Sequence, residues 1–324
     1  MMQNDELIAP MNEILKELLQ KMENAQLSGE TLSPQMFRGT MELVALQMEG
    51  EKAELYDVAD FEIDLEERNL PVRLYRPSGE KNLPIVLFFH GGGWVGGNRT
   101  THDGLCRNLS RFSDAQVLSV EYRLAPEHPY PAAVEDALET FEWVRKNAEK
   151  LGADAERIGL SGDSAGGNLT ANIAMKFAGE SGPCAQVMFC PSLNQVAKTA
   201  SKTTFGKGYM LDLCQMEWFL QQYGGGKLDL QDPRISPWFG PVSEHYPHTL
   251  VVTGGYDPLR DEGIAFAEKL KEKGVEASWS CYGEMVHGFS CFGVLPRAVD
   301  SVREAGEYFQ KVFAEHKFVA EIRE

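Results

Sequence analysis

A serine stands between glycines in the stretch Gly162-Asp163-Ser164-Ala165-Gly166, which follows the apolar run RIGL and precedes the helix-like run LTANIAMKFAG. The G-x-S-x-G pattern is typical of a nucleophile elbow, a sharp turn from a strand into a helix. Flanking glycines let the chain reverse with almost no side chain in the way, so the serine hydroxyl stands exposed. The stretch therefore predicts a nucleophile at Ser164, and the alternative is a tight turn whose serine caps the helix.

A second glycine cluster, HGGGW, follows a buried apolar run. A serine that attacks an ester carbonyl creates an oxyanion, which needs N–H donors held close to it. Glycines let the backbone approach that closely, so we expect Gly92 and Gly93 to supply two donors and Ala165, directly after the serine, to supply a third. The alternatives are a flexible loop and a phosphate-binding loop, but the cluster has no G-x-x-x-x-G-K-[ST] pattern and no nearby lysine.

Candidates for a base and an acid follow the serine. A serine hydroxyl is a weak nucleophile until a base takes its proton, and a carboxylate must orient that base. Asp257 comes shortly after the strand-like run TLVVTGG, and His287 comes shortly after VEASWSCYG, which is the order serine, acid, histidine. Asp261 and Glu262 are rival acids, but we expect them in the first turn of the next helix, where the helix dipole favours carboxylates.

Several other titratable residues have ordinary structural interpretations. His102 and His128 fall in polar loops, and His316 falls on the terminal helix. Asp163 lies beside the nucleophile, but the elbow directs neighbouring side chains away from the serine. We therefore expect Asp163 to hydrogen-bond loop backbone.

The elements that must hold these residues alternate between strands and helices. Apolar residues three or four apart predict amphipathic helices between about residues 5 and 50. Two segments around residues 67–69 alternate like a hairpin, and unbroken apolar runs such as LPIVLFF predict buried strands. Strands that alternate with helices indicate a mostly parallel sheet covered on both faces, whose ligands gather at the carboxyl ends of the strands.

Composition narrows the class of protein. The chain has 324 residues, enough to bury a large core, and a net charge of −17, which disfavours binding to nucleic acids and anionic lipids. No apolar run approaches the roughly 18 residues of a membrane span. The N-terminal sequence shows no basic region followed by an apolar run, and the six scattered cysteines lack C-x-x-C spacing, so we expect free thiols in the cytoplasm.

Five blocks of sequence together resemble one family. HGGGWVGGN, EYRLAPEHPYPAAVED, GDSAGGN, DPLRDEG and HGF occur in order between about Pro84 and Phe289. They resemble the hormone-sensitive-lipase-like carboxylesterases, bacterial family IV of the α/β-hydrolase superfamily. The resemblance implies an α/β-hydrolase fold with a mostly parallel eight-stranded sheet, helices on both faces and a helical cap. It also implies hydrolysis of short- to medium-chain acyl esters by a serine esterase without metal or cofactor.

The resemblance carries roles to individual residues. It assigns Ser164, Asp257 and His287 as the catalytic triad, and Gly92, Gly93 and Ala165 as oxyanion donors. It divides the chain into an N-terminal cap segment at residues 1–50 and a catalytic domain at 51–324, with a cap insertion at about 197–226. Acyl-chain preference depends on the pocket walls, for which the candidates are Met36, Phe37, Trp94, Tyr122, Leu193, Met210, Trp218 and Phe219.

Two other functions stay open at this point. An amidase or peptidase would use the same triad on an amide. A noncatalytic binding module on the same scaffold, as in plant gibberellin receptors, would lack the catalytic histidine, whereas His287 is present here. Homodimerisation through sheet edges is a further open alternative.

Overall fold

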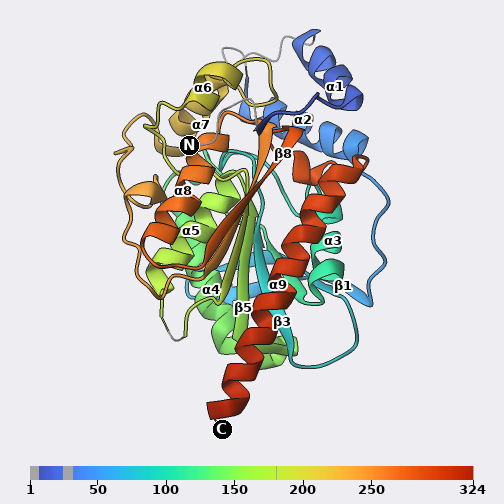
Figure 1. Ribbon diagram of the computed structural model, residues 1–324, viewed down its shortest axis with the longest axis vertical. Helices are drawn as coiled ribbons and strands as arrows, with labels where there is room; N and C mark the ends of the chain where they lie inside the picture. The colour runs from blue at the N-terminus through green and yellow to red at the C-terminus, as the bar shows by residue number, and fades with distance from the viewer. Residues whose placement is uncertain (1–6, 25–31, 180, 324) are drawn as a thin grey trace.

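An eight-stranded sheet forms the centre of the molecule, in the strand order β1-β2-β4-β3-β5-β6-β7-β8 (Figure 1). The structure is a computed structural model and describes residues 7–24, 32–179 and 181–323. Strands β1 and β2 form an antiparallel hairpin, β2 also pairs antiparallel with β4, and all other neighbours are parallel. The expectation of a mostly parallel eight-stranded sheet is confirmed.

The strands are β1 (Asp57–Leu65), β2 (Arg68–Arg76), β3 (Leu83–Phe89), β4 (Gln116–Val120), β5 (Ala153–Asp163), β6 (Ala185–Phe189), β7 (His248–Tyr256) and β8 (Ala277–Val286). The α-helices are α1 (Glu13–Asn24), α2 (Pro34–Met48), α3 (Asp103–Ser113), α4 (Ala132–Leu151), α5 (Ala165–Phe177), α6 (Ala200–Phe205), α7 (Leu213–Gly224), α8 (Arg260–Glu272) and α9 (Pro296–Arg323). The sequence patterns described above do not predict helix α3.

The central strands are buried on both faces. Along β3, alternate side chains enter two separate apolar clusters, with Leu87 and Phe89 in one and Val86 and Phe88 in the other. Helices α4, α5 and α8 complete the first cluster, while α3 and α9 complete the second. Such strands need no polar face, which explains the unbroken apolar run in the sequence.

Local sequence signals set the helix ends. Helix α2 begins after Ser33, whose hydroxyl accepts a hydrogen bond from the Met36 N–H at 3.1 Å, and Pro34 fills the first helical position. Helix α4 ends at Gly152, which has a φ of 66°, a left-handed conformation that glycine adopts without a steric penalty.

Four helices gather at the end of the molecule where the parallel strands finish. Figure 1 shows α1, α2, α6 and α7 together at this end, above the sheet. This is the region expected to form the cap. The boundaries at residues 1–50 and about 197–226 remain predictions, and residues 1–6 and 25–31 of the first segment lie outside the described residues.

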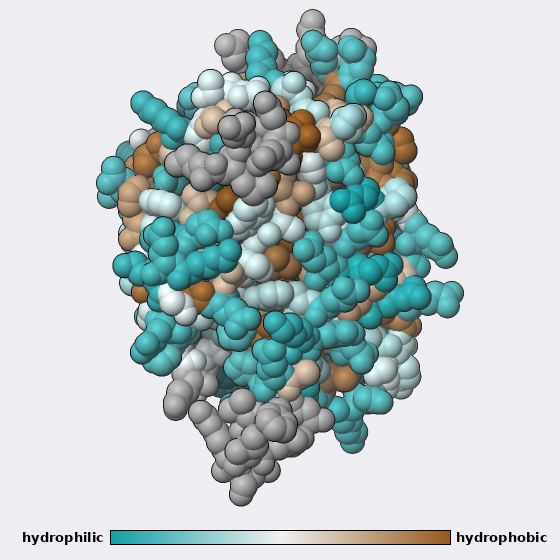
Figure 2. All heavy atoms as spheres, in the orientation of Figure 1, coloured by the Kyte–Doolittle hydropathy of each residue, from teal (hydrophilic) through white to brown (hydrophobic). Residues whose placement is uncertain are grey.

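Hydrophilic side chains cover most of the face shown in Figure 2, with small hydrophobic areas between them. Among the described residues, no helix is both long enough and apolar enough to cross a membrane. All six cysteines lie in the described part of the chain, and they are unpaired.

The turn between β5 and α5 is packed so closely that it admits only glycine. A Cβ atom added to Gly166 would lie 1.8 Å from the carbonyl oxygen of Phe89, and one added to Gly162 would lie 2.6 Å from the backbone of Gly166. At Gly167, the first contact would be the side chain of Pro191 at 2.8 Å. The elbow therefore brings helix α5 against the neighbouring strands at backbone distance.

Gly166→Ala should lower the free energy of unfolding by about 2 kcal/mol or more, because backbone atoms would have to move to admit the methyl group. Gly104→Ala is the matched control, since no atom lies within 4 Å of its added Cβ in helix α3. The control should be neutral or stabilising by up to about 1 kcal/mol. Urea unfolding measures both, and equal stability of the two variants would contradict the close packing of the elbow.

Candidate active site

Three predicted residues meet at the carboxyl ends of three strands. Ser164 directly follows β5, Asp257 follows β7, and His287 follows β8. Nε2 of His287 lies 2.9 Å from Oγ of Ser164, and its Nδ1 lies 3.1 Å from both carboxylate oxygens of Asp257. The Leu259 N–H also donates to Asp257 at 2.8 Å, which helps to fix the carboxylate. This chain of hydrogen bonds can carry a proton away from the serine.

The backbone of Ser164 is strained in the way an exposed nucleophile requires. Its φ of 53° and ψ of −114° are unfavourable for a side-chain-bearing residue. The conformation is held because the Ser164 N–H donates to the carbonyl of Phe189, at the end of β6, at 2.9 Å, and helix α5 begins at the next residue. The hydroxyl consequently lies at the helix N-terminus, where the helix dipole favours negative charge.

The surroundings of His287 raise its pKa above the usual value. Burial of the imidazole is the largest single influence and acts to lower the pKa. The nearby carboxylate of Asp257 favours the charged form through its charge and its hydrogen bonds, and together with other carboxylates it outweighs burial. The carboxylates of Asp163 and Glu262 act in the same direction. The site is therefore arranged to stabilise an imidazolium, the form that appears when the histidine takes a proton.

The HGGG loop lies beside the nucleophile. Gly92 and Gly93 both have positive φ, 115° and 60°. A Cβ on Gly92 would lie 2.3 Å from the carbonyl oxygen of Gly96, and a Cβ on Gly93 would lie 2.3 Å from the ring of Phe219. Both glycines line the same cavity as Ser164. The role of Gly92, Gly93 and Ala165 as oxyanion donors remains a prediction, and Ala165 lines a smaller cavity beside Ser164.

Asp163 holds this loop against the elbow. Its Oδ1 accepts a hydrogen bond from the Gly91 N–H at 2.8 Å and lies 3.1 Å from Nε2 of His102. Burial acts to raise the pKa of Asp163 and to lower that of His102, but neighbouring groups outweigh it in both cases. The pKa of Asp163 is lowered, chiefly by His102, and that of His102 is raised by Cys291 and Asp163. The interpretation of Asp163 as a backbone-binding residue agrees with this contact. His102, expected in a polar loop, is instead a buried partner of Asp163.

A cavity of about 730 Å³ opens above Ser164 and His287. Of the predicted wall residues, Phe37, Met210 and Phe219 line it. Trp94 lines a second, smaller cavity of about 20 Å³ beside Ser164 and stacks on Tyr223, with ring centroids 4.5 Å apart.

Four predicted wall residues line neither cavity, which corrects the expectation. Met36 points outward and is 52% exposed, because it lies about 100° around α2 from the buried Phe37. Trp218 packs against the rings of Phe37 and Phe219, which also contact one another. Tyr122 is buried, and its hydroxyl donates to the carbonyl of His90, while Leu193 is a fully buried core residue.

The sequence analysis missed most of the apolar wall. Met41 and Val44 of α2 line the cavity at four and seven positions after Phe37, a helical spacing that was visible in the sequence. Leu19 and Met22 of α1 also line the cavity and are three positions apart on one helix. Further missed apolar wall residues come from separate segments: Met11, Leu32, Leu211 and Phe292.

Two groups of possible metal ligands occur in the described residues. Within each group, the donor atoms lie within 4.8 Å of one another. One contains His102, Asp163 and Cys291, and the other contains Cys190 with Asp257 and His287. In each group the histidine and the aspartate already bind one another, so we assign neither group as a metal site. The absence of a required metal or cofactor remains a prediction.

Comparison with known proteins shows which proteins the chain is related to. Residues 86–291 match the family described as alpha/beta hydrolase fold. The carboxylic ester hydrolase LipN of Mycobacterium tuberculosis is 41% identical over 241 residues, which cover 72% of this chain and 64% of LipN. The ethyl acetate hydrolase of Pseudomonas putida is 37% identical over 237 residues, covering 71% of this chain and 74% of that protein.

Solved structures agree with these relatives. The hyperthermophilic esterase of Pyrobaculum calidifontis has a TM-score of 0.87 and 38% identity, covering 94% of this chain and 99% of that one. An ester hydrolase from the metagenome of Lake Arreo, solved with a derivative of bipyridine phosphonate, has a TM-score of 0.88 and 36% identity, with the same coverage of 94% and 99%. The chain belongs to the hormone-sensitive-lipase-like carboxylesterases of the α/β-hydrolase superfamily.

The raised pKa of His287 predicts how ester hydrolysis depends on pH. A protonated imidazole cannot accept the serine proton, so kcat/KM for a nitrophenyl ester should fall as the pH drops, with its midpoint above about 6.5. In Asp257→Asn, burial is no longer opposed by that carboxylate, so the midpoint of the residual activity should move to lower pH. A pH–rate profile measures both, and a flat wild-type rate from about pH 5 to 9 would contradict the role of His287.

Proposed function

We propose that this protein is a serine carboxylesterase in which Ser164 is the nucleophile, His287 is the general base and Asp257 orients and stabilises the imidazolium. The observation that carries the proposal is the continuous hydrogen-bonded chain from Oγ of Ser164 through His287 to Asp257, at 2.9 and 3.1 Å. The names of the relatives as ester hydrolases support the same reaction.

The first half of the reaction forms an acyl-enzyme. His287 takes the proton of Ser164 as Oγ attacks the ester carbonyl. The resulting oxyanion accepts hydrogen bonds from the N–H groups of Gly92, Gly93 and Ala165, which cost no reorganisation because the loop and helix already hold them. Collapse of the tetrahedral intermediate breaks the bond to the alcohol, and His287 gives the leaving alkoxide its proton.

The second half releases the acid. His287 removes a proton from a water molecule, which attacks the acyl group on Ser164. A second tetrahedral intermediate forms on the same donors and collapses to the carboxylic acid, returning the proton from His287 to Ser164. The chain thus supplies every proton acceptor and donor that the cycle needs.

The apolar cavity supports acyl esters of short to medium length as substrates. Its volume of about 730 Å³ and its aromatic, methionine and aliphatic walls suit an apolar chain rather than a charged one. The small cavity beside Trp94 leaves much less room on the other side of Ser164. We further propose that α1, α2, α6 and α7 act as the cap over this cavity, and that the protein works in the cytoplasm, which its unpaired cysteines support.

Removal of the nucleophile tests the assignment. Ser164→Ala should lose about 10⁵-fold or more in kcat on a nitrophenyl ester, because no other group can form the acyl-enzyme. Labelling by an organophosphonate, detected as a mass increase of the intact protein, should occur in the wild type and be absent in Ser164→Ala. Unchanged activity in the variant would refute the esterase mechanism, while an unlabelled and inactive wild type would favour a noncatalytic binding module.

A series of nitrophenyl esters tests the substrate class. Because each buried methylene contributes about 0.8 kcal/mol, kcat/KM should rise about fourfold per added carbon from acetate onward until the cavity is full, and then fall. Val44→Trp places a large ring in the cavity and should reduce activity on the longer esters most. Leu46→Trp, on the same helix but 70% exposed, is the matched control and should keep the wild-type preference.

The outcomes of that series separate the alternatives. Activity that falls steadily from acetate, or that is equal in both tryptophan variants, would contradict an acyl chain in this cavity. A jump in activity above the solubility limit of the ester would indicate a true lipase. The matching amides, assayed in parallel, would show whether the amidase reaction competes.

A further inference from the structure

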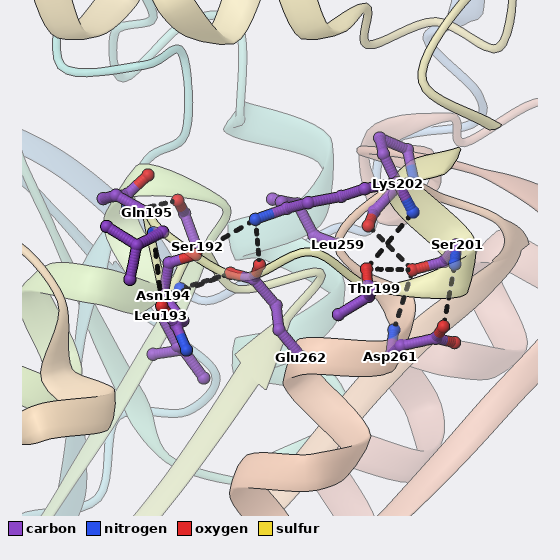
Figure 3. Close-up of polar contacts among 12 residues, drawn as sticks. Ser192, Leu193, Asn194, Gln195, Thr199, Ser201, Lys202, Leu259, Asp261 and Glu262 are labelled. Atoms are coloured by element: carbon purple, nitrogen blue, oxygen red, sulfur yellow. Dashed lines mark hydrogen bonds and ion pairs between the residues drawn. The ribbon is translucent and has the colours of Figure 1, made fainter. Parts of the chain in front are cut away.

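A buried ion pair lies next to the proposed active site, outside the triad. Nζ of Lys202, on α6, lies 2.6 Å from Oε2 of Glu262, on the first turn of α8. Glu262 is 2% exposed and Lys202 is 7% exposed. Figure 3 shows the two side chains meeting beside the loop that follows β6. Removing two charges from water is costly unless other contacts compensate for it. The hydrogen bonds around the pair therefore indicate which parts of the chain it connects.

The carboxylate of Glu262 fixes the loop after β6. Its Oε1 accepts hydrogen bonds from the backbone N–H groups of Leu193, at 2.8 Å, and Asn194, at 3.1 Å. Nζ of Lys202 donates to the carbonyl of Asn194 at 3.0 Å. The ion pair therefore binds backbone N–H groups of this loop through Glu262 and a backbone carbonyl through Lys202. Glu262 was expected only to interact with the dipole of α8, but it also fixes this loop.

The same elements hold the turn that carries the acid. Ser201 lies next to Lys202. Its hydroxyl donates to the carbonyl of Pro258 at 2.8 Å, and its backbone N–H donates to the carboxylate of Asp261 at 2.8 Å. Pro258 directly follows Asp257. Helix α6 is thus attached on one side to the acid-bearing turn and, through Lys202, to the loop after β6 (Figure 3).

The loop after β6 also reaches the nucleophile. The N–H of Ser192 donates to the carbonyl of Ser164 at 3.2 Å, and Ser192 also lines the small cavity beside the nucleophile. The ion pair is consequently connected to Ser164 through the loop after β6. It is connected to Asp257 through the first turn of α8. These are the two residues between which His287 must be placed.

The charge of Glu262 also acts on His287 directly. The imidazole contacts Asp257 at the end of β7 and lies close to the thiol of Cys190 after β6, while the charges of Asp163 at the end of β5 and Glu262 on α8 act on it from further away. Each of the three carboxylates favours the protonated imidazole. Burial raises the pKa of Glu262 itself, and the ammonium of Lys202 opposes that rise and so favours its charged form.

We propose that Lys202 and Glu262 are a positioning pair for the proposed triad, which holds the nucleophile, the acid and the α6 segment in one arrangement and supplies part of the negative charge around His287. This inference rests on the proposed function. It makes Lys202, in the segment expected to form the cap, a determinant of turnover at a distance from the substrate.

The test compares Lys202→Met, Glu262→Gln and the double variant with the wild type. Each single variant should lose about 10- to 100-fold in kcat with a smaller change in KM, because the reacting groups are misplaced while the apolar cavity remains. Glu262→Gln should also move the acidic midpoint of kcat/KM, and the NMR titration of the His287 ring, to lower pH, since a negative charge is removed.

The double variant separates positioning from folding. With both charges gone, it should recover stability in urea relative to Lys202→Met, but the low kcat and the shifted midpoint should persist. Arg157→Met is the matched control, because it breaks the half-buried ion pair with Asp154 at the other end of β5, about 20 Å from Ser164. The control should lose stability and keep the wild-type kcat and midpoint.

The possible results are distinct. Wild-type kcat and midpoint in the double variant would overturn the inference and leave the pair a purely structural one, as would equal kinetic losses in Arg157→Met. Failure of the esterase proposal itself would appear earlier, as absence of wild-type hydrolysis and of phosphonate labelling at Ser164.

Discussion

The hydrogen bond between Nε2 of His287 and Oγ of Ser164 joins residues 123 positions apart in the chain. It forms because parallel strands of one sheet end at the same edge, so the loops after β5, β7 and β8 arrive together. A twist or shift of any of these strands would separate the two atoms. The apolar clusters on both faces of the sheet, which fix the strands in place, therefore serve the geometry of one proton transfer.

Buried charges surround this hydrogen bond in pairs. Asp257 faces His287, Asp163 faces His102, and Glu262 faces Lys202. Each carboxylate also accepts a backbone N–H, at the turn after β7, at the HGGG loop and at the loop after β6 respectively. A buried carboxylate with a partner and a backbone bond is costly to move, so these three groups turn flexible strand-end loops into rigid ones.

The cavity follows a different physical rule. Its walls are mostly apolar side chains from several distant segments. Phe37, Met41 and Val44 share one face of α2, and Leu19 and Met22 lie three positions apart on α1. Contacts of this kind fix volume and polarity, whereas the strand-end loops fix the positions of reacting atoms. Substrate range and catalytic geometry can therefore change independently, with one exception: α6 contributes Lys202 to the buried ion pair and leads directly into the wall around Met210.

The sequence by itself determined the sheet, the order of the proposed triad and the glycine loops, because these depend on local patterns: buried runs, G-x-S-x-G, HGGG and strand ends followed by Asp257 and His287. It did not determine the pocket wall, where Met36 points outward and Tyr122 and Leu193 are core residues, nor the partners of His102 and Glu262. The packing of distant elements decides which face of a helix lines a cavity. It also decides which buried charged groups pair with one another. Only the tertiary structure decides those contacts, since neither burial nor pairing between distant segments is encoded in a local spacing.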